Sequence, residues 1–298
     1  MKLAVGFLTY NESSARYLPD FWPSLQSALS VWGGDYKVLV GDNSESALNP
    51  NAVFFNFADP KLEFIWNRAN LGFSKGYNRL IARARELEAE YFLVINPDTV
   101  LDKEAIKELI SALDRDLNLA SASPKVLDLH SGRIDTLGLV LKPGLRFADY
   151  GQGQEDKGDQ PSIIGPSGAA GLFRMSALES IKEKGQYFDE RMFMYKEDCD
   201  LAYRLFSRGQ VSRLVQEAVV YHDRSARVSD PGLLGIIKGR KSKSRQIRQW
   251  SFQNQRLIWR KHWSKQNLKN KIIILSLRFL SYLWAIFFER FLFNNRKK

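Results

Sequence analysis

The chain has 298 residues, 44% of them apolar, so it is long enough to bury a sizeable core and too apolar to be disordered. Its single cysteine, Cys199, excludes an internal disulfide and a multi-cysteine zinc site. The net charge of +11 is uneven: residues 224–298 hold 19 basic and 2 acidic residues, a net +17, which leaves −6 for residues 1–223. This asymmetry indicates that the tail meets a polyanion or an anionic membrane surface.

Apolar runs alternate with helix-like stretches through the first half of the chain. Strands are predicted over residues 3–10, 37–42, 62–67 and 91–96, and helices over residues 18–31, 76–90 and 103–116. This alternation predicts βαβ units and an α/β fold with a mostly parallel central sheet flanked by helices. The opening MKLAVGFLTYNES has the character of a first strand rather than a secretory signal, so we expect a cytoplasmic protein.

Polar residues follow each predicted strand, and in such sheets ligands bind at the carboxyl ends of the strands. After the second strand, the carboxylate of Asp42 is able to accept the ring N–H of uracil or thymine, although an Asx-turn explains it equally well. Gly72 and Gly76 lie where the backbone turns tightly, or approaches a ligand, before a helix.

Asp98 follows the most apolar strand, in the stretch YFLVINPDTVLD. Pro97 prevents normal strand pairing and fixes a turn. A carboxylate here suits Mg²⁺ or Mn²⁺ bound to a substrate phosphate, because these cations take few protein carboxylates and complete their shell with phosphate oxygens. The alternative is a Pro-Asp turn that caps the next helix.

The middle of the chain, residues 120–170, is rich in Gly, Ser and Pro and predicts loops and short strands, with residues 151–162 as its most linker-like segment. It holds neither a dinucleotide fingerprint nor a P-loop. Residues 167–173, SGAAGLF, supply small side chains that suit the close approach of a sugar and an acceptor, or else a tightly packed strand turn.

Glu197, Asp198 and Asp200 crowd the start of a predicted helix. One interpretation is a proton acceptor, since the helix dipole favours an ionised carboxylate near the N-terminus. The other is an acidic first turn with an i,i+4 pair between Asp200 and Arg204. Cys199 lies among these acids and is a poor nucleophile, because neighbouring carboxylates disfavour its thiolate.

The C-terminal tail has two parts: residues 239–271 are basic with interleaved tryptophans, and residues 272–293 are nearly all apolar but interrupted by Arg278. The stretch from Phe279 to Phe288 is too short to span a bilayer alone, and a spanning helix would hold Arg278 at depth. We therefore expect residues 1–223 to form the main domain. Residues 224–298 are expected to form a basic amphipathic helical tail on an anionic membrane surface. A core-packed helix pair, or docking to nucleic acid or protein, are the alternatives.

Seven segments follow one another along the chain in a characteristic order: LTYNES, VLVGDNSES, NRANLGFSKGYNRLI, VINPDTVL, SGAAGLFRMSAL, FDERMFMYKEDCDLAYRLFSRG and VVYHDRS. Together they resemble the signature of glycosyltransferase family 2, the inverting enzymes with a GT-A fold, and most of all its bacterial rhamnosyltransferase-like members. The resemblance covers residues 1 to about 225 and implies a nucleoside-diphosphate sugar and a divalent cation, Mg²⁺ or Mn²⁺, as partner and cofactor. It does not specify the basic tail.

The resemblance also implies roles for individual residues. The nucleotide-sugar pocket would be lined by Thr9, Asn11, Glu12, Asp42, Asn70, Gly72, Lys75 and Asn96, and the space around sugar and acceptor by Gly168, Ala169 and Ala170. Asp98 would hold the metal through the family's DxD element, with His222 either as a further ligand or merely hydrogen-bonded. Asn96 stands where many members have the first aspartate, a variant that the rhamnosyltransferase-like members share. Arg224 or Arg227 would add positive charge beside the diphosphate.

By the same resemblance, Asp198 is the general base that takes the proton of the attacking hydroxyl, and Glu197 orients the acceptor or the backbone. His130 and His262 have no companions that would make them ligands. The expected function is inverting transfer of a sugar, with rhamnose favoured, from dTDP or UDP to a glycan or lipid-linked saccharide in cell-surface polysaccharide synthesis.

We expect the enzyme to be peripheral on the inner face of the cell membrane, with no nucleic acid as partner. A nucleic-acid-binding protein that uses the basic tail, whose affinity would fall steeply with salt, is one alternative. A non-catalytic nucleotide-sugar-binding subunit is the other.

Overall fold

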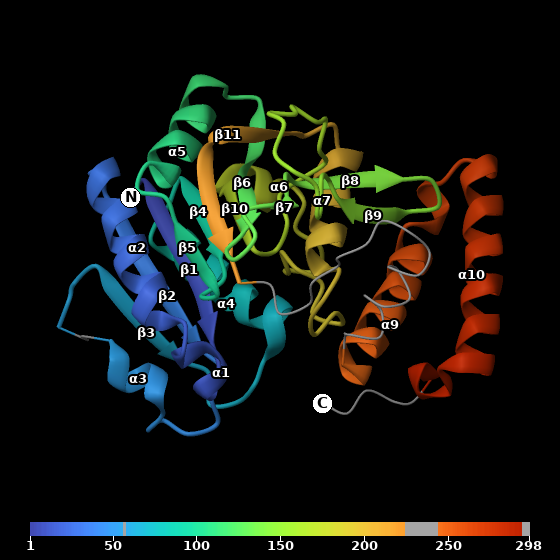
Figure 1. The fold of residues 1–298 in the computed structure, drawn as a ribbon, viewed down its shortest axis with the longest axis horizontal. Coiled ribbons are helices and arrows are strands. Elements are labelled where there is room, and N and C mark those ends of the chain that lie inside the picture. Colours follow the sequence, from blue (N-terminus) through green and yellow to red (C-terminus); the bar gives the residue numbers. More distant parts are fainter. Residues whose placement is uncertain (56–57, 224–243, 294–298) are drawn as a thin grey trace.

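The computed structural model describes residues 1–55, 58–223 and 244–293. Figure 1 shows a central sheet with helices on both sides and a pair of helices, α9 and α10, at one end. The main sheet is formed by β1 (Leu3–Thr9), β2 (Tyr36–Asp42), β3 (Leu62–Trp66), β4 (Tyr91–Ile95), β5 (Thr99–Leu101), β6 (Leu119–Asp128), β7 (Ile134–Thr136), β10 (Ala170–Arg174) and β11 (Val211–His222). A separate hairpin is formed by β8 (Leu139–Lys142) and β9 (Arg146–Asp149).

The helices occur where the apolar periodicity predicts them, with short additions. They are α1 (Asn11–Ala15), α2 (Leu18–Trp32), α3 (Pro50–Phe54), α4 (Gly72–Glu86), α5 (Ala105–Arg115), α6 (Met175–Ser180), α7 (Glu197–Ser207), α9 (Arg245–Lys261) and α10 (Leu268–Phe288). Short 3₁₀ turns follow at Trp263–Lys265 and Arg290–Phe293.

The strand order of the main sheet is β3-β2-β1-β4-β10-β6-β11-β5, with β7 beside β6. The first four strands in this order are parallel, and Gly6 of β1 pairs with Leu39 of β2 and Val94 of β4. Their carboxyl ends therefore lie at one edge of the sheet. β10 enters antiparallel between β4 and β6, and β6 and β11 are again parallel. The predicted α/β fold is confirmed.

The strand β6 is longer than the sequence analysis predicted for this region, because it runs for 10 residues. Its Ser121 and Ser123 are fully buried between β10 and β11. The small polar residues that suggest loops in the sequence lie here inside the sheet, where their small side chains allow close packing.

The core has a layer on each face of the sheet, and β1 shows how the alternation of side chains divides them. Leu3, Val5 and Phe7 belong to the cluster that includes α2 and α5. Ala4 points the other way, into the cluster built by Tyr77 and other residues of α4 and by α6 and α7. Two covered faces leave the carboxyl edge of the strands as the place for a site.

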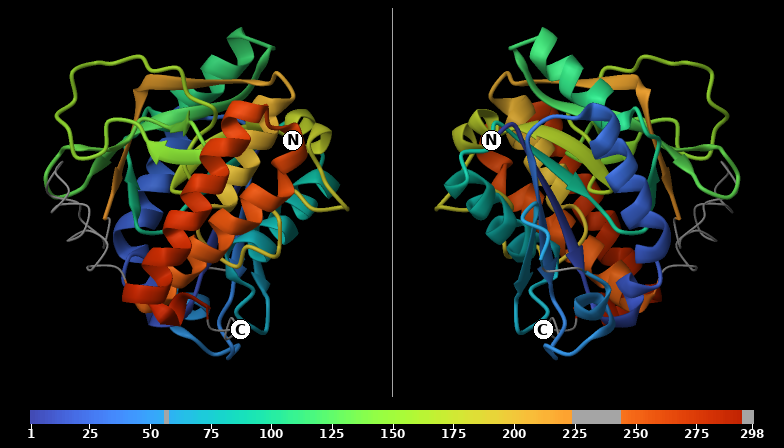
Figure 2. Two further views of the ribbon diagram at one scale, coloured as in Figure 1. Left: turned by 90° about the vertical axis from the view of Figure 1, so that its right-hand side faces the viewer. Right: turned by 90° about the vertical axis from the view of Figure 1, so that its left-hand side faces the viewer.

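The tail helices that the structure describes pack on the rest of the chain. The indole of Trp259 in α9 donates a hydrogen bond to the carbonyl of Gly144 at 2.8 Å, and Ile258 and Ile274 are fully buried against α7 and the β8–β9 hairpin. Figure 2 shows α10 outermost, on the far side of α9 from the sheet. α10 continues for 21 residues through Arg278, so the whole helix, unlike the stretch from Phe279 to Phe288, is long enough to cross a membrane, with Arg278 inside it.

A buried ionic cluster joins α7 to the end of α9. Asp200 is fully buried, and its carboxylate is 2.8 Å from each of Arg204, Lys261 and His262. Burial alone would raise the pKa of Asp200, but these donors outweigh it and hold the pKa well below its usual range. The pair with Arg204 that the sequence suggests is therefore present, and it is structural. His262 belongs to this cluster and not to a metal site.

We expect Asp200→Asn to lower the free energy of unfolding by about 3–5 kcal/mol at pH 7, because it leaves buried cations without a carboxylate. The folded pKa is lowered, so this contribution is fully present above the unfolded value near ~3.9 and is lost as pH falls below it. Urea unfolding from pH 7 to pH 3 measures this difference. Asp116→Asn, at the half-exposed pair with Arg213, is the control and should cost under ~1 kcal/mol. Equal effects of the two variants would contradict the assignment.

Candidate active site

Two motifs that lie 100 residues apart in the chain meet at the carboxyl edge of β4. Beyond this strand, the backbone N–H of Asn96 donates to the carbonyl of Ala169 at 2.9 Å. The next residue back, Gly168, donates its N–H to Oδ2 of Asp198 at 3.0 Å. Two consecutive residues, Gly168 and Ala169, thus connect the turn that carries Asp98 to the start of α7.

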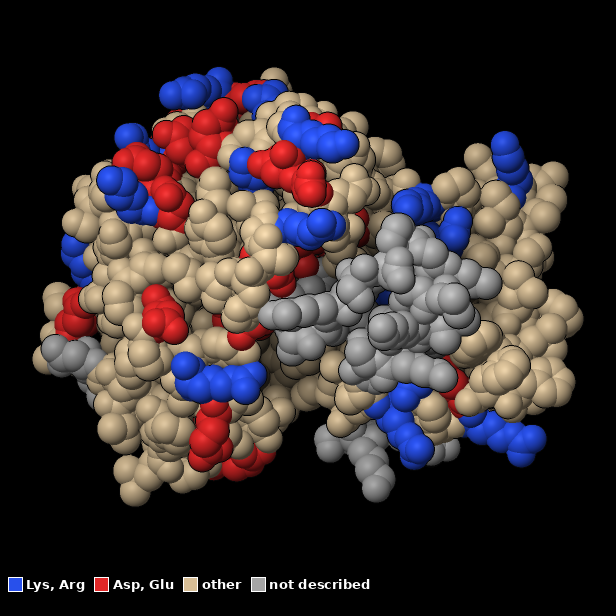
Figure 3. Space-filling model, in the orientation of Figure 1, with Lys and Arg blue, Asp and Glu red and all other residues tan. Residues whose placement is uncertain are grey.

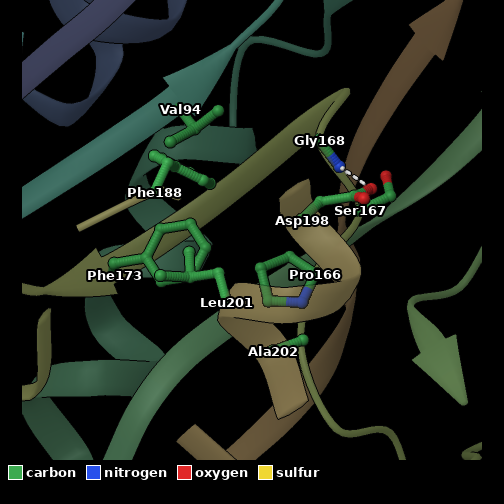
Figure 4. A pocket seen from close by; sticks show the side chains of 9 residues that line it. All are labelled: Val94, Pro166, Ser167, Gly168, Phe173, Phe188, Asp198, Leu201 and Ala202. Carbon is green, nitrogen blue, oxygen red and sulfur yellow. Dashed lines mark hydrogen bonds between the residues drawn. The ribbon is translucent and has the colours of Figure 1, made fainter. Parts of the chain in front are cut away.

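A small cavity, about the size of one water molecule, lies at this junction (Figure 4). Ser167, Gly168 and Asp198 supply its polar side, and its apolar side is formed by Val94, Pro166, Phe173, Phe188, Leu201 and Ala202. The hydroxyl of Ser167, which the sequence analysis did not single out, is buried and has no hydrogen-bond partner among the described residues. Of the predicted small residues only Gly168 lines the cavity. Ala169 and Ala170 are buried in the pairing with β4.

The neighbouring acids of α7 have different environments. Asp198 accepts hydrogen bonds from the N–H of Gly168 on Oδ2 and from the N–H of Cys199 on Oδ1, at 3.0 and 2.7 Å. Glu197 is buried, its Oε2 has no described partner, and burial, followed by the charge of Asp198, raises its pKa well above the usual value. Two adjacent carboxyl groups in such different surroundings are able to take different roles, and the buried Glu197 is the one favoured in the neutral form.

Burial also decides the state of Cys199, the residue that follows these acids. It raises the pKa of the thiol well above its usual value, with the charge of Asp198 as a smaller cause. The sequence analysis named only the neighbouring charges. The conclusion that this thiol is a poor nucleophile is unchanged.

Asp98 faces His222, the last residue of β11, because β5 and β11 pair beside the turn. Oδ1 of Asp98 is buried and lies 3.4 Å from Nε2 of His222, in an ion pair without a well-aligned hydrogen bond to any described residue. Nδ1 of His222 is 2.8 Å from Asp135, a residue that the sequence analysis did not single out. Burial opposes the charged ring, but the contacts with Asp135 and Asp98 outweigh it and raise the pKa of His222 to about 9.

A carboxylate oxygen opposite an imidazole nitrogen, with the other ring nitrogen bound to a second carboxylate, is a donor set that fits a divalent cation once the ring has released the proton on Nε2. Within the described ranges no group of three or more His, Cys, Asp or Glu residues could hold a metal ion. A site here therefore needs ligands from the substrate, as is usual for Mg²⁺ and Mn²⁺ bound to a diphosphate.

Asp42 lies at the edge formed by the ends of β1 and β2 and is fully buried. Its Oδ1 accepts hydrogen bonds from Thr9 and Ser44, each at 2.8 Å, and its Oδ2 accepts one from Asn49 at 2.9 Å. The carboxylate thus organises this end of the sheet. A further acceptor position remains on Oδ2, but Asp42 is fully buried, so a base reaches it only if neighbouring groups move aside.

The remaining predicted nucleotide-binding residues lie around this corner. The N–H of Asn11 donates to Ser44 and its amide to Glu45, while Glu12 is exposed on α1. Asn70 accepts the N–H of Gly72 at the start of α4. Lys75, one turn into α4, is exposed and has no ion pair within the part of the chain that the structure describes. Arg224 and Arg227 lie outside the described residues.

Gly72 is required by the backbone at the start of α4. Its φ is +70°, and a Cβ there would lie 2.5 Å from the carbonyl oxygen of Phe193. We expect Gly72→Ala to cost at least about 2 kcal/mol, from the left-handed conformation and from the clash with backbone. A thermal melt measures the loss, with Gly132→Ala as the control, because that glycine has a φ of +68° but nothing within 4 Å. A Gly72→Ala variant no less stable than this control would contradict the role of close contact.

Comparisons with known proteins show the family of the chain. Residues 5–182 match the model of glycosyl transferase family 2. The chain is 27% identical over 246 residues to N-acetylglucosaminyl-diphospho-decaprenol L-rhamnosyltransferase of Mycobacterium tuberculosis, covering 75% of this chain and 76% of that protein. It is 30% identical over 144 residues to the low-salt glycan biosynthesis hexosyltransferase Agl10 of Haloferax volcanii, covering 48% and 46%.

Solved structures share the fold at lower identity. TarS of S. aureus is 17% identical with a TM-score of 0.54, over 81% of this chain, which spans only 38% of the length of TarS. A complex of GalNAc-T7 with UDP, GalNAc and Mn²⁺ is 10% identical with a TM-score of 0.53, over 81% of this chain and 48% of that one. The match to the family model, over residues 5–182, includes most of β1, all of β2 and β4, and the turn that carries Asp98. The chain belongs to glycosyltransferase family 2.

Proposed function

We propose that the protein transfers a sugar, with inversion, from a dTDP or UDP donor to a hydroxyl of a glycan or lipid-linked saccharide. The observation that carries this proposal is the short connection from the turn of Asp98, through Asn96, Ala169 and Gly168, to Asp198. Direct displacement at a sugar carbon needs one group near the departing diphosphate and another that accepts the proton of the attacking hydroxyl. Asp98 and Asp198 would supply them at one edge of the sheet.

In this mechanism Asp198 takes the proton of the acceptor hydroxyl, and the N–H of Gly168 keeps the carboxylate directed to the cavity. Ser167 offers its hydroxyl to the same space. Glu197 stays neutral beside the base and supports the backbone from which α7 starts. Asp98 and His222 would hold Mg²⁺ or Mn²⁺, which when bound neutralises charge on the departing nucleoside diphosphate. The pocket for the nucleotide sugar, called here the nucleotide side, is formed by Thr9, Asn11, Glu12, Asp42, Asn70, Gly72, Lys75 and Asn96.

The mycobacterial relative suggests the chemistry of donor and acceptor. Its name gives rhamnose as the sugar transferred and N-acetylglucosamine on a decaprenyl diphosphate as the acceptor. We therefore favour a rhamnose donor and a polyprenyl-diphosphate-linked amino sugar, in the synthesis of a cell-surface polysaccharide.

The experiment is a panel of dTDP-, UDP- and GDP-sugars with Mn²⁺, in which melting temperature and release of nucleoside diphosphate are measured. A donor that binds the native state raises the melting point, and a transferase slowly releases nucleoside diphosphate even to water. Binding without release would favour a non-catalytic subunit. Neither binding nor release by any donor would overturn the proposal.

We also propose that α10 attaches the enzyme to the inner face of the cell membrane. Among the residues that the structure describes, one helix, α10, is by length and composition able to cross a membrane, and only 11% of its most apolar window is buried. Its exposed apolar side chains recur at helical spacing, at Leu268, Ile272, Leu275, Phe279, Ile286 and Phe287. Figure 3 shows mostly uncharged side chains over α10, with Lys and Arg toward its ends. An apolar face with flanking basic residues suits an interfacial helix on anionic lipid.

Vesicle flotation tests this attachment. We expect the protein to float with vesicles that contain phosphatidylglycerol, and Phe279→Glu with Phe287→Glu to reduce the floating fraction at least ~10-fold. Phe206→Glu, at an exposed phenylalanine of α7, is the matched control and should float normally. A gel shift with duplex DNA at physiological salt, without flotation, would instead favour nucleic-acid binding.

A further inference from the structure

The tail helix α9 lies along the segment that leads to the proposed base. Lys261 is 3.3 Å from Asp189 at the beginning of this segment. Further along the segment, the ring of Tyr195 stacks on Trp250 with centroids 6.4 Å apart, and the ring of Phe193 packs against it at a tilt with centroids 5.2 Å apart. The family model ends at residue 182, so this contact surface lies outside the matched part of the chain.

The backbone just before α7 is in an unfavourable conformation. Tyr195 and Lys196 have φ values of +70° and +69°, in the left-handed region that side chains other than glycine seldom adopt. Such residues cost on the order of 1–3 kcal/mol each and persist only where the surroundings hold them. Asp198 comes two residues after Lys196, in the first turn of α7, so its direction depends on this turn.

The carbonyl groups of residues 192–195 are held from two sides. The hydroxyl of Ser74 and the N–H of Phe73, both at the start of α4, donate to the carbonyls of Met192 and Phe193. On the other side, the amide of Asn254 in α9 donates to the next two carbonyls, those of Met194 and Tyr195, at 2.9 and 2.6 Å. Asn254 is fully buried.

We propose that Asn254 is a positioning residue for Asp198. Its amide holds the left-handed turn at residues 195–196 in place, and this turn fixes the start of α7, from which Asp198 reaches the N–H of Gly168. Trp250 supports the same turn by stacking on Tyr195. This role rests on the proposed function, since it takes Asp198 as the base. The tail would thus be part of the catalytic unit as well as an attachment to the membrane.

The test uses the full chain, Mn²⁺ and the donor that the wild-type protein turns over. Release of nucleoside diphosphate gives kcat and the donor KM, and calorimetry with Mn²⁺ and free nucleoside diphosphate gives a Kd. We expect Asn254→Ala to lower kcat about 10- to 100-fold, since misplacement by about 1 Å costs this much. KM and Kd should stay within about twofold, because the nucleotide side is not touched. Trp250→Leu should lower kcat by a smaller factor, about 3- to 10-fold.

The matched control is Trp259→Phe. It also removes a buried hydrogen bond from α9 to a backbone carbonyl, at Gly144 of the hairpin turn, and should leave kcat within about twofold. Equal losses of kcat in Asn254→Ala and Trp259→Phe, or a Kd that rises as much as kcat falls, would overturn the proposal. If Asn254→Ala does not fold, an unchanged kcat in Trp250→Leu overturns it. A wild-type protein without turnover refutes the proposed function itself and, with it, this role of Asn254.

Discussion

Asp198→Asn should lower kcat by about 10²–10⁴-fold while the Kd for nucleoside diphosphate and Mn²⁺ changes less than about threefold. The range is that of removing a positioned general base. The asparagine is nearly the same size, and its amide oxygen still accepts one of the two backbone N–H groups that Asp198 binds now. The start of α7 should therefore keep its place, so the loss reports on the proton acceptor. Single-turnover release of nucleoside diphosphate, with calorimetry for binding, measures both quantities.

Glu197→Gln is the matched control, one residue away on the same helix. Because burial raises the pKa of Glu197, its side chain is favoured in the neutral form, and a neutral amide replaces it with little change of charge. We expect kcat to fall less than about threefold and the melting temperature to change by no more than a few degrees. If Glu197→Gln loses as much as Asp198→Asn, the roles of the two acids are exchanged.

Much of the fold follows from the sequence, because its signals are local. Alternating apolar runs such as Leu3, Val5 and Phe7 predict the strands, and the order of strands and helices predicts the parallel sheet. The family motifs select Asp98 and Asp198, which the structure brings to one edge. These features depend on residues close together in the chain or on a pattern shared with relatives.

The supporting contacts could not be predicted in the same way. Asp135 meets His222 across 87 residues, and Asn254 meets Tyr195 across 59. Each joins segments whose relative position is set by the packing of the whole chain, and no periodicity marks them. Burial is equally invisible in the sequence. It separates Glu197 from Asp198, and it makes Asp42 a buried anchor where its motif suggests an open acceptor.

The second large effect is expected at Asp98. Asp98→Asn should lower turnover with Mn²⁺ by about 10²–10³-fold and weaken binding of nucleoside diphosphate in the presence of Mn²⁺, because several kcal/mol of charge stabilisation depend on this carboxylate. Wild-type protein with excess chelator should show a loss of similar size. Calorimetry with and without Mn²⁺ measures the binding separately from the chemistry.

Asp135→Asn supplies the graded comparison for this site. This substitution keeps the size of the side chain that holds Nδ1 of His222 and acts on the cation only through that ring, so a loss of about 10- to 100-fold is expected. Asp98→Asn should lose more turnover than Asp135→Asn, because the carboxylate of Asp98 would hold the cation itself, whereas that of Asp135 only orients the ring of His222. Turnover in Asp98→Asn that Mn²⁺ still stimulates as in the wild type would show that the cation is held elsewhere, and the pairing of Asp98 with His222 would then be a structural contact.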